Sequence, residues 1–290
     1  MKLANYQKDG FVRAGIVKGE NLYEIPQDAE NAAISSVDQI LEERLLDSVR
    51  RNETKITSGH GIPVSMAKLR SPVIYPEKII LVAVNYGAHG KEENLKPPPY
   101  PYLFAKYRNA LIGPGDPILV PKVSAKVDWE VELAVVIGKE GKDIGKEDAL
   151  DHVAGYTISN DVSFRDLQMQ KTEGLGMNWI KGKSLDSSFP LGPWLVTRDE
   201  IPDPNELDIS LSVNGVEKQS SNTGDLLVKV DGLVSYASLG MTLRPGDIIS
   251  TGTPSGVGHA TGGPYLKDGD VVESKIERIG TLRNPARSEG

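Results

Sequence analysis

The stretch from Val127 to Gly138 constrains the fold of this chain more than any other. Acidic and apolar residues alternate in its first half, and a wholly apolar run follows. Successive side chains of an extended strand point to opposite faces, so Asp128, Glu130 and Glu132 are expected to share one face. Same-face neighbours lie about 7 Å apart, close enough for unscreened carboxylates to repel one another. The apolar run is typical of a buried strand.

The shared acidic face leaves two interpretations open. The first is an edge strand whose carboxylates are solvated. The second is a divalent-metal site, because carboxylate oxygens are the preferred ligands of hard cations. The chain contains no cysteine, which excludes disulfides, thiolate zinc sites and cysteine nucleophiles. Any metal must therefore be bound through oxygen or imidazole ligands.

Short β-rich runs separated by glycine, proline and asparagine turns continue from Pro72 to near the end of the chain. They cover residues 78–84, 117–120, 130–137, 154–159, 207–213, 247–250 and 270–276. Few segments have helical periodicity. This pattern predicts a mostly β, α+β fold with a mixed β-roll or sandwich, and it disfavours an alternating nucleotide-binding sheet.

The first part of the chain has a different character. Residues 1–70 are predicted to form a small N-terminal α/β domain, and residues 71–290 the β-rich domain. A strand is expected over residues 11–17, followed by a helix that begins at Ser36 with Ser36 and Gln39 as a capping box. The apolar stripe of that helix comprises Val37, Ile40, Leu41, Leu45 and Val49.

Residues 85–99 form a candidate lid, because two glycines, several charged residues and a proline run disfavour fixed structure. Within this segment His89 and Glu92 are three residues apart. On one helical turn they would lie on the same side, and the carboxylate would orient the imidazole as a general base. The alternative is a surface turn with a histidine of no special role.

A second candidate cluster follows the predicted strand that ends in Asp161. Ser163 and Asp166 match a capping box for a helix directly after this strand. Asp161 is placed where a further oxygen ligand can reach a metal bound by the acidic strand. Arg165 and Gln168 are one turn apart and can face the same site. The alternatives are a structural turn, a surface cation and a glutamine without a role.

Two loops complete the set of candidates. Lys183 lies between Gly182 and Ser184, where the backbone can approach a ligand closely, and its ammonium can hold a substrate oxyanion. The glycine-rich loop at Gly252 and Thr253 lacks the Gly-Lys-Ser/Thr ending of a phosphate loop, which argues against a nucleotide. Its N–H groups and the Thr253 hydroxyl can receive a carboxylate, or the loop is an ordinary turn.

The formal charge of −7 disfavours nucleic acid and anionic membranes as partners. No run approaches the roughly 18 apolar residues of a membrane span. Small molecules are therefore the expected ligands, and the cytoplasm the expected location.

Six motifs in this order resemble the fumarylacetoacetate hydrolase family over roughly residues 72–282. They are Asn85-Tyr86 with His89 and Glu92, Asp128-Trp-Glu-Val-Glu132, Asn160-Asp-Val-Ser-Phe-Arg-Asp-Leu-Gln168, Gly182-Lys-Ser184, Pro190-Leu-Gly-Pro193, and Pro245-Gly-Asp-Ile-Ile-Ser-Thr-Gly-Thr-Pro254. Each motif alone is weak. Six in one order are hard to obtain by chance.

The resemblance implies a β-roll catalytic domain preceded by a small N-terminal domain, and a homodimer. It also implies magnesium or manganese, with calcium as a substitute in crystals, bound by Glu130, Glu132 and Asp161. The remaining carried-over roles are His89 and Glu92 as the water-activating pair, Lys183 as the oxyanion-stabilising lysine, Arg165 and Gln168 as substrate-site residues, and Gly252 and Thr253 as receivers of substrate oxygens. Two departures, Phe164 in place of a small residue and Glu93 beside Glu92, can reshape the pocket.

The implied activity is that of the acylpyruvate hydrolase and 2-hydroxyhepta-2,4-diene-1,7-dioate isomerase branch of the family. Its substrate is a 2-oxo or 1,3-diketo acid such as an acylpyruvate, whose C–C bond is hydrolysed through a stabilised enolate. The alternatives are decarboxylation of oxaloacetate, and isomerisation or decarboxylation of unsaturated diacids in aromatic catabolism. A non-catalytic binding protein would lack one of the ligands or the lysine.

Overall fold

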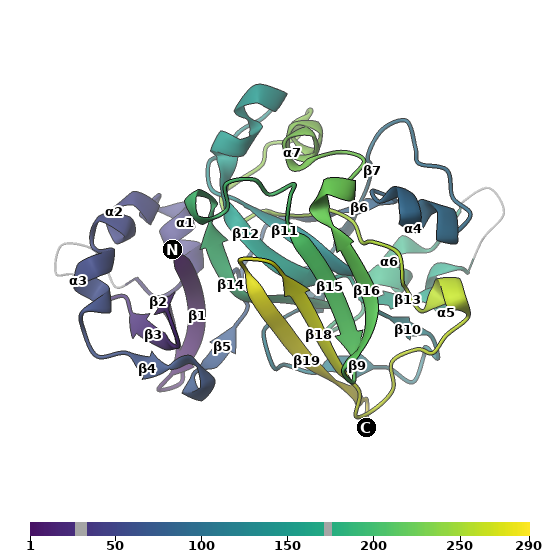
Figure 1. Ribbon diagram of the computed structural model, residues 1–290, viewed down its shortest axis with the longest axis horizontal. Helices are drawn as coiled ribbons and strands as arrows, with labels where there is room; N and C mark the ends of the chain where they lie inside the picture. Colours follow the sequence, from purple (N-terminus) through teal and green to yellow (C-terminus); the bar gives the residue numbers. More distant parts are fainter. Residues whose placement is uncertain (27–33, 171–175) are drawn as a thin grey trace.

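The computed structural model describes residues 1–26, 34–170 and 176–290, and its largest element is a twelve-stranded mixed sheet (Figure 1). The strands of its main path, in spatial order, are β4 (Ile62–Pro63), β3 (Asn21–Glu24), β2 (Phe11–Lys18), β1 (Lys2–Lys8), β14 (Phe189–Thr197), β12 (Val153–Asn160), β11 (Val131–Ile137), β17 (Ile248–Ser250), β6 (Ile79–Ala83) and β7 (Tyr102–Lys106). Two further strands, β5 (Lys68–Arg70) and β8 (Leu111–Ile112), pair with β1 and β14.

A second sheet of five strands packs against the first, and Figure 1 shows it in front of β11 and β12. Its strands are β16 (Val216–Asn222), β15 (Asp208–Val213), β18 (Val271–Ile276), β19 (Gly280–Ser288) and β9 (Ile118–Val120). The largest apolar core lies between the two sheets. The predicted fold class, mostly β with mixed sheets in a sandwich-like arrangement, is confirmed, and the sheets are open.

Strand β11 is central and explains the apolar run in the sequence. It pairs with β12 on one side and β17 on the other, and all seven of its residues are buried. Val131, Leu133 and Val135 face the core between the sheets, whereas Ala134 and Val136 face a second core. A strand covered on both faces has apolar side chains on both. The edge-strand interpretation is therefore wrong.

The first seventy residues are joined to the main sheet, because β1 pairs antiparallel with β14. The division of the chain at residue 70 stays a prediction. Ser36 caps α1 (Val37–Glu42) as expected, with its hydroxyl accepting a bond from the Gln39 N–H. The prediction of one continuous helix from Ser36 through Val49 is wrong. Arg44 adopts a φ of 57°, and a second helix, α2 (Leu46–Arg51), follows.

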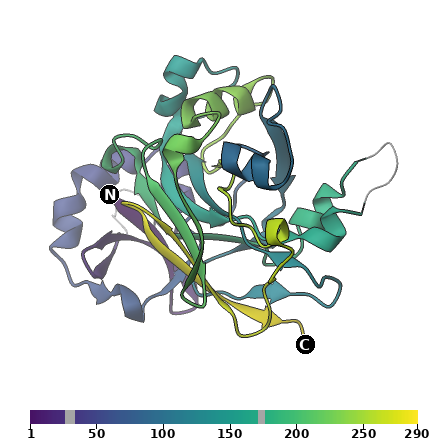
Figure 2. The same ribbon diagram turned by 45° about the vertical axis from the view of Figure 1, so that its right-hand side comes forward.

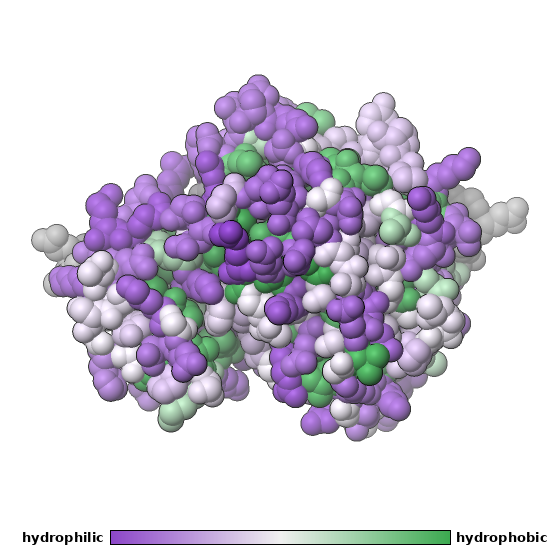
Figure 3. Space-filling view, viewed as in Figure 1, coloured by the Kyte–Doolittle hydropathy of each residue, from purple (hydrophilic) through white to green (hydrophobic). Residues whose placement is uncertain are grey.

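The other α-helices in the described part of the chain are short, as the lack of helical periodicity predicted. They are α3 (Glu53–Thr57), α4 (Gly87–Glu92), α5 (Arg165–Gln168), α6 (Trp179–Lys183) and α7 (Val230–Ser238). Figures 1 and 2 show α4, α5 and α6 on the side of the molecule opposite the N-terminal strands. Among the described residues, no helix is long and apolar enough to cross a membrane. On the face seen in Figure 3, apolar side chains occur in groups separated by hydrophilic ones.

Candidate metal centre and active site

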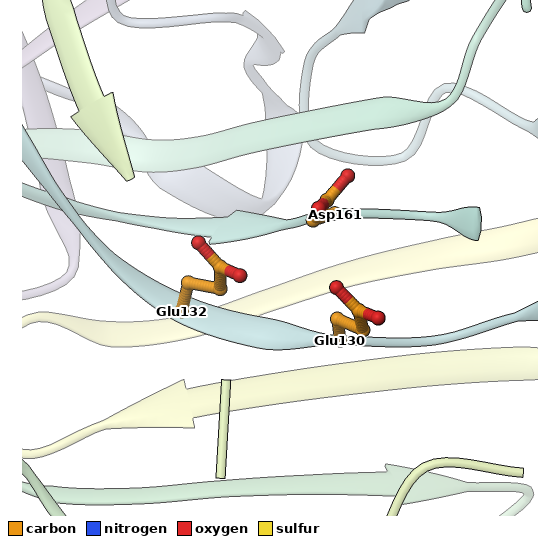
Figure 4. Close-up of side chains that lie close together, drawn as sticks. All are labelled: Glu130, Glu132 and Asp161. Atoms are coloured by element: carbon orange, nitrogen blue, oxygen red, sulfur yellow. The ribbon is translucent and has the colours of Figure 1, made fainter. Parts of the chain in front are cut away.

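Three buried carboxylates converge at the end of β11, as Figure 4 shows. Glu130, Glu132 and Asp161 each offer one oxygen, and these oxygens lie within 4.8 Å of one another. The antiparallel register of β11 and β12 pairs Val131 with Asn160, and the Asp161 N–H donates to the Glu130 carbonyl at 2.8 Å. The pairing of these two strands thus brings Asp161 next to Glu130, although thirty residues separate them in the sequence. Three hard oxygen donors at this spacing fit a divalent cation.

Cations of the protein surround two of these carboxylates. The Lys183 ammonium donates to Glu130 Oε2 at 2.8 Å, to Asp161 Oδ2 at 2.6 Å and to the Ser163 hydroxyl at 2.6 Å. Arg165 donates to the other oxygen of Glu130 at 2.5 Å. Burial raises the pKa of the Glu130 carboxyl, but Lys183 and Arg165 outweigh it and the pKa falls below its usual range.

Glu132 has no such cation. Its Oε2 accepts from the Ser250 hydroxyl and from the Gly252 N–H, the latter at 3.0 Å. Burial and the neighbouring charges of Asp161 and Glu130 raise the pKa of Glu132 well above its usual value. Its charged form therefore gains most from a bound cation.

Sequence reasoning missed Lys106, a fully buried lysine at the end of β7. Its ammonium lies 3.0 Å from Asp161 Oδ1 and donates to the Val162 and Ser188 carbonyls, each at 2.9 Å, and to the Lys183 carbonyl. Burial lowers its pKa to about 8. The only signal in the sequence was a lysine closing an apolar strand, and the pairing of β6 with β7 gives it this position.

Asp128 lies apart from the triad and positions Arg165. It belongs to a two-residue strand, β10 (Val127–Asp128), which pairs with β13 (Ser163–Phe164) and not with the partner of β11. Its carboxylate accepts from Arg165 Nε at 2.9 Å and from the N–H groups of Gly258 and His259, at 2.7 and 2.9 Å. The expectation that all three acids share one face is wrong for Asp128, because the chain leaves the regular strand between β10 and β11.

The predicted capping box at Ser163 is also wrong. Helix α5 has no side-chain cap. The Ser163 hydroxyl donates to the Asp161 carbonyl, and the Asp166 carboxylate accepts from the Ser124 hydroxyl and the Ala125 N–H instead. The Lys183 ammonium also donates to Ser163, so partners distant in the sequence take up both side chains.

His89 and Glu92 lie on one turn of α4, and His89 Nδ1 is 2.9 Å from Glu92 Oε1, the spacing that the sequence predicted. Both carboxylate oxygens of Glu92 also accept from the Gly256 N–H, at 3.1 and 3.0 Å. The Asn85 side chain donates to the Val228 and Thr251 carbonyls. These bonds hold the start of the segment in place, and its movement as a lid stays a prediction.

Gly256 connects the glycine-rich loop to α4 through its bond to Glu92, and we expect Gly256→Ala to be strongly destabilising. Its φ is +104°, and an added Cβ would collide with the Lys218 carbonyl. Gly269→Ala is the matched control, because its φ is +85° but nothing lies within 4 Å. Gly256→Ala should cost about 1–3 kcal/mol more than the control in urea unfolding. Equal costs for the two variants would contradict this packing.

A cavity of about 250 Å³ opens beside the triad. The predicted residues that line it are His89, Glu130, Glu132, Arg165, Gln168, Lys183 and Thr253. The Gly252 N–H is bonded to Glu132, and the Thr253 hydroxyl donates to the Val131 carbonyl. Gly182 was expected to let the backbone approach a ligand, but a Cβ there would meet Gln168. Its lack of a side chain lets α6 pack against α5.

The family described as fumarylacetoacetate (FAA) hydrolase C-terminal matches residues 78–287. The chain belongs to this family. It is thus an enzyme, and the family predicted from the six motifs is confirmed. A curated relative from Xenopus laevis, named oxaloacetate tautomerase, mitochondrial, is 48% identical over 230 residues, which are 79% of this chain and 71% of the relative.

Solved structures of the family share the whole fold. Maleylpyruvate hydrolase from Sphingobium sp. SYK-6, in complex with manganese(II) and pyruvate, has 31% identity and a TM-score of 0.80 with full coverage of both chains. The 2-hydroxyhepta-2,4-diene-1,7-dioate isomerase from Mycobacterium marinum has 33% identity and a TM-score of 0.77, covering 100% of this chain and 99% of that one. Both belong to the branch that the sequence predicted.

Proposed function

We propose that this protein is a divalent-metal-dependent hydrolase that cleaves a C–C bond in an acylpyruvate or a related 1,3-diketo acid. The convergence of three carboxylates beside the hydrogen-bonded His89 and Glu92 carries this proposal. The first feature suits a cation that a 2-oxo acid can chelate, and the second suits activation of water. The manganese and pyruvate complex of the related hydrolase supports the same assignment.

Glu130, Glu132 and Asp161 would bind magnesium or manganese, since both ions favour oxygen ligands. When bound, the ion would supply Lewis-acid stabilisation of the negative charge that develops on the 2-oxo group. The charge balance supports this role. Four buried carboxylates, of Asp128, Glu130, Glu132 and Asp161, face three buried cations, of Lys106, Arg165 and Lys183. With all seven groups ionised, one negative charge is left over, and a divalent ion would turn it into one positive charge that suits an anionic substrate.

The residues of the chain would then carry the proton transfers. His89, oriented by Glu92, takes a proton from the water that attacks the distal carbonyl. Lys183 exchanges one of its three present acceptors for the oxyanion of the tetrahedral adduct. The bond between the attacked carbon and the methylene breaks, its electron pair stays on the pyruvate fragment as an enolate, and this fragment takes up a proton. Arg165, Gln168 and Thr253, which line the cavity, would orient the substrate, and Gly252 would act through its bond to Glu132.

Tautomerisation of oxaloacetate is the second candidate, and the name of the relative at 48% identity favours it. It moves a proton between the methylene carbon and the 2-oxo oxygen, so it needs a proton carrier but no attacking water. His89 lines the cavity and can carry this proton. Decarboxylation of oxaloacetate and isomerisation of unsaturated diacids would use the same enolate, and they stay alternatives.

A substrate panel with magnesium tests the proposal. Acetylpyruvate hydrolysis is followed by coupled reduction of pyruvate, and loss of enol-oxaloacetate by its ultraviolet absorbance. We expect stoichiometric acetate and pyruvate from acetylpyruvate. Catalysis of the oxaloacetate enol–keto exchange without any acylpyruvate cleavage would replace hydrolysis by tautomerisation as the function.

Removal of the metal should abolish turnover and lower the melting temperature. After dialysis against a chelator, either Mg²⁺ or Mn²⁺ is expected to restore both. An ion at about 100 times its Kd stabilises the folded chain by about 2.7 kcal/mol, because it binds the folded state only. Scanning calorimetry with and without each ion measures the shift. A chelated protein with full activity would refute a metal-dependent reaction.

The homodimer follows from the family resemblance, and the cytoplasmic location from the sequence alone. Both stay predictions, as does a role in aromatic catabolism. The relatives from Xenopus laevis and Rattus norvegicus, at 48% and 42% identity, carry the word mitochondrial in their names. Size-exclusion chromatography with light scattering tests the dimer.

A further inference from the structure

The cavity beside the triad is lined by polar and by apolar side chains. The polar ones include the triad glutamates, His89, Arg165 and Lys183. The apolar and aromatic ones include Val84, Tyr102, Phe104, Met169, Met177 and Trp179. A 2-oxo acid head bound at the triad would contact the polar groups. The acyl group attached to that head would then lie against other side chains of the lining.

Three of these side chains are aromatic rings that form one wall of the cavity. The Trp179 ring lies 4.7 Å from that of Phe104 and 5.5 Å from that of Tyr102, centroid to centroid. Tyr102 and Phe104 are two residues apart on β7 and so share a face. The Lys183 ammonium lies 5.4 Å from the Phe104 centroid. The wall therefore starts at the catalytic lysine and leads outward to Tyr102, which is 48% exposed.

The charge distribution argues against a second carboxylate at this wall. Arg165 already donates to Asp128, Glu130 and Gln168, and Lys183 to Glu130, Asp161 and Ser163. Lys96 lines the cavity at its exposed rim, and the Glu93 carboxylate, which also lines it, would repel a second carboxylate. A carboxylate pressed against rings and thioethers would lose its hydration without a partner, whereas an alkyl or aryl group there leaves water.

We propose that Tyr102, Phe104 and Trp179 form a subsite for the acyl group, which selects acylpyruvates with an aryl or longer alkyl acyl group. The inference rests on the proposed hydrolase function and narrows its substrate class. The reaction stays balanced: water adds its hydroxyl to the acyl carbon, the C–C bond breaks, and the pyruvate methylene gains a proton. Benzoylpyruvate would thus give benzoate and pyruvate.

Comparison of benzoylpyruvate with acetylpyruvate tests the subsite. We expect kcat/KM for the benzoyl compound to exceed that for the acetyl compound by at least about tenfold, because one methylene in an apolar pocket is already worth about 10–200-fold. Trp179→Ala and Tyr102→Ala should each bring this ratio towards one. The control Phe11→Ala removes an aromatic side chain on β2 that is 64% exposed, and should leave the ratio unchanged.

Succinylpyruvate, whose acyl group ends in a carboxylate, tests whether the enzyme prefers a charged acyl group instead. A tenfold preference for it over benzoylpyruvate would overturn the proposal. The proposal would also fail if Trp179→Ala and Tyr102→Ala both kept the wild-type kcat/KM ratio of benzoylpyruvate to acetylpyruvate. If no acylpyruvate is cleaved but oxaloacetate is tautomerised, the hydrolase function fails. The subsite is then tested by measuring how tightly acylpyruvates inhibit the tautomerisation. Benzoylpyruvate must then inhibit at least tenfold more tightly than acetylpyruvate, and equal inhibition constants would overturn the subsite as well.

Discussion

Glu132→Gln should reduce metal affinity by more than about 100-fold, because residues that only orient metal ligands already contribute about 10–100-fold. Turnover should fall by about 10³-fold, since Lewis-acid stabilisation is worth several kcal/mol and each 1.4 kcal/mol is about a factor of ten. Isothermal titration with Mn²⁺ and the acetylpyruvate assay measure the two effects. Glutamine keeps the shape of the side chain and an oxygen that can accept from Ser250 and Gly252.

The stability of the metal-free variant separates loss of the ligand from unfolding. A carboxyl whose pKa is raised by folding stabilises the protein at low pH, and this contribution is lost as the pH rises through the folded-state pKa. Near neutral pH the amide should therefore leave the metal-free chain at least as stable as the wild type. Glu130→Gln should instead destabilise it, because Arg165 and Lys183 lose a buried partner.

Glu140→Gln, an exchange of the same type at an exposed position, is the control and should change neither affinity nor turnover. If Glu132→Gln binds Mn²⁺ as tightly as the wild type, Glu132 is not a ligand. The proposed centre would then have to be abandoned.

His89→Gln should lower acylpyruvate hydrolysis by about 10²–10⁴-fold, the usual contribution of a general base. Metal affinity should not change, because His89 lies outside the triad. Glu92→Gln should have a smaller effect, since the amide can still hold the imidazole while losing its charge. His60→Gln, at an exposed histidine in the N-terminal segment, should be without effect.

Measuring both reactions in this variant distinguishes the candidate functions. If hydrolysis falls but the oxaloacetate enol–keto exchange persists, His89 activates water and another group carries the tautomeric proton. If both fall together, His89 moves protons in both. Full hydrolytic turnover by His89→Gln would remove this residue from the mechanism.

Local periodicity was enough to find much of the candidate site. Alternation along a strand placed Glu130 and Glu132 on one face, and the spacing of His89 and Glu92 placed them on one helical turn. It failed where a side chain found a distant partner. Ser163 and Asp166 have the spacing of a cap, yet Ser163 accepts from Lys183, and Asp166 accepts from Ser124 and Ala125.

The sequence by itself determined the β-rich fold class, because strand and turn signals act between near neighbours in the chain. Six motifs in one order identified the family, and the resemblance to it named the residues of the triad. Only the tertiary structure decided that β11 is central, that Lys106 joins the triad, and that Tyr102, Phe104 and Trp179 form one wall. These features depend on which distant strands and helices meet, and burial then decides which charges must be paired. No spacing along the chain encodes those distances.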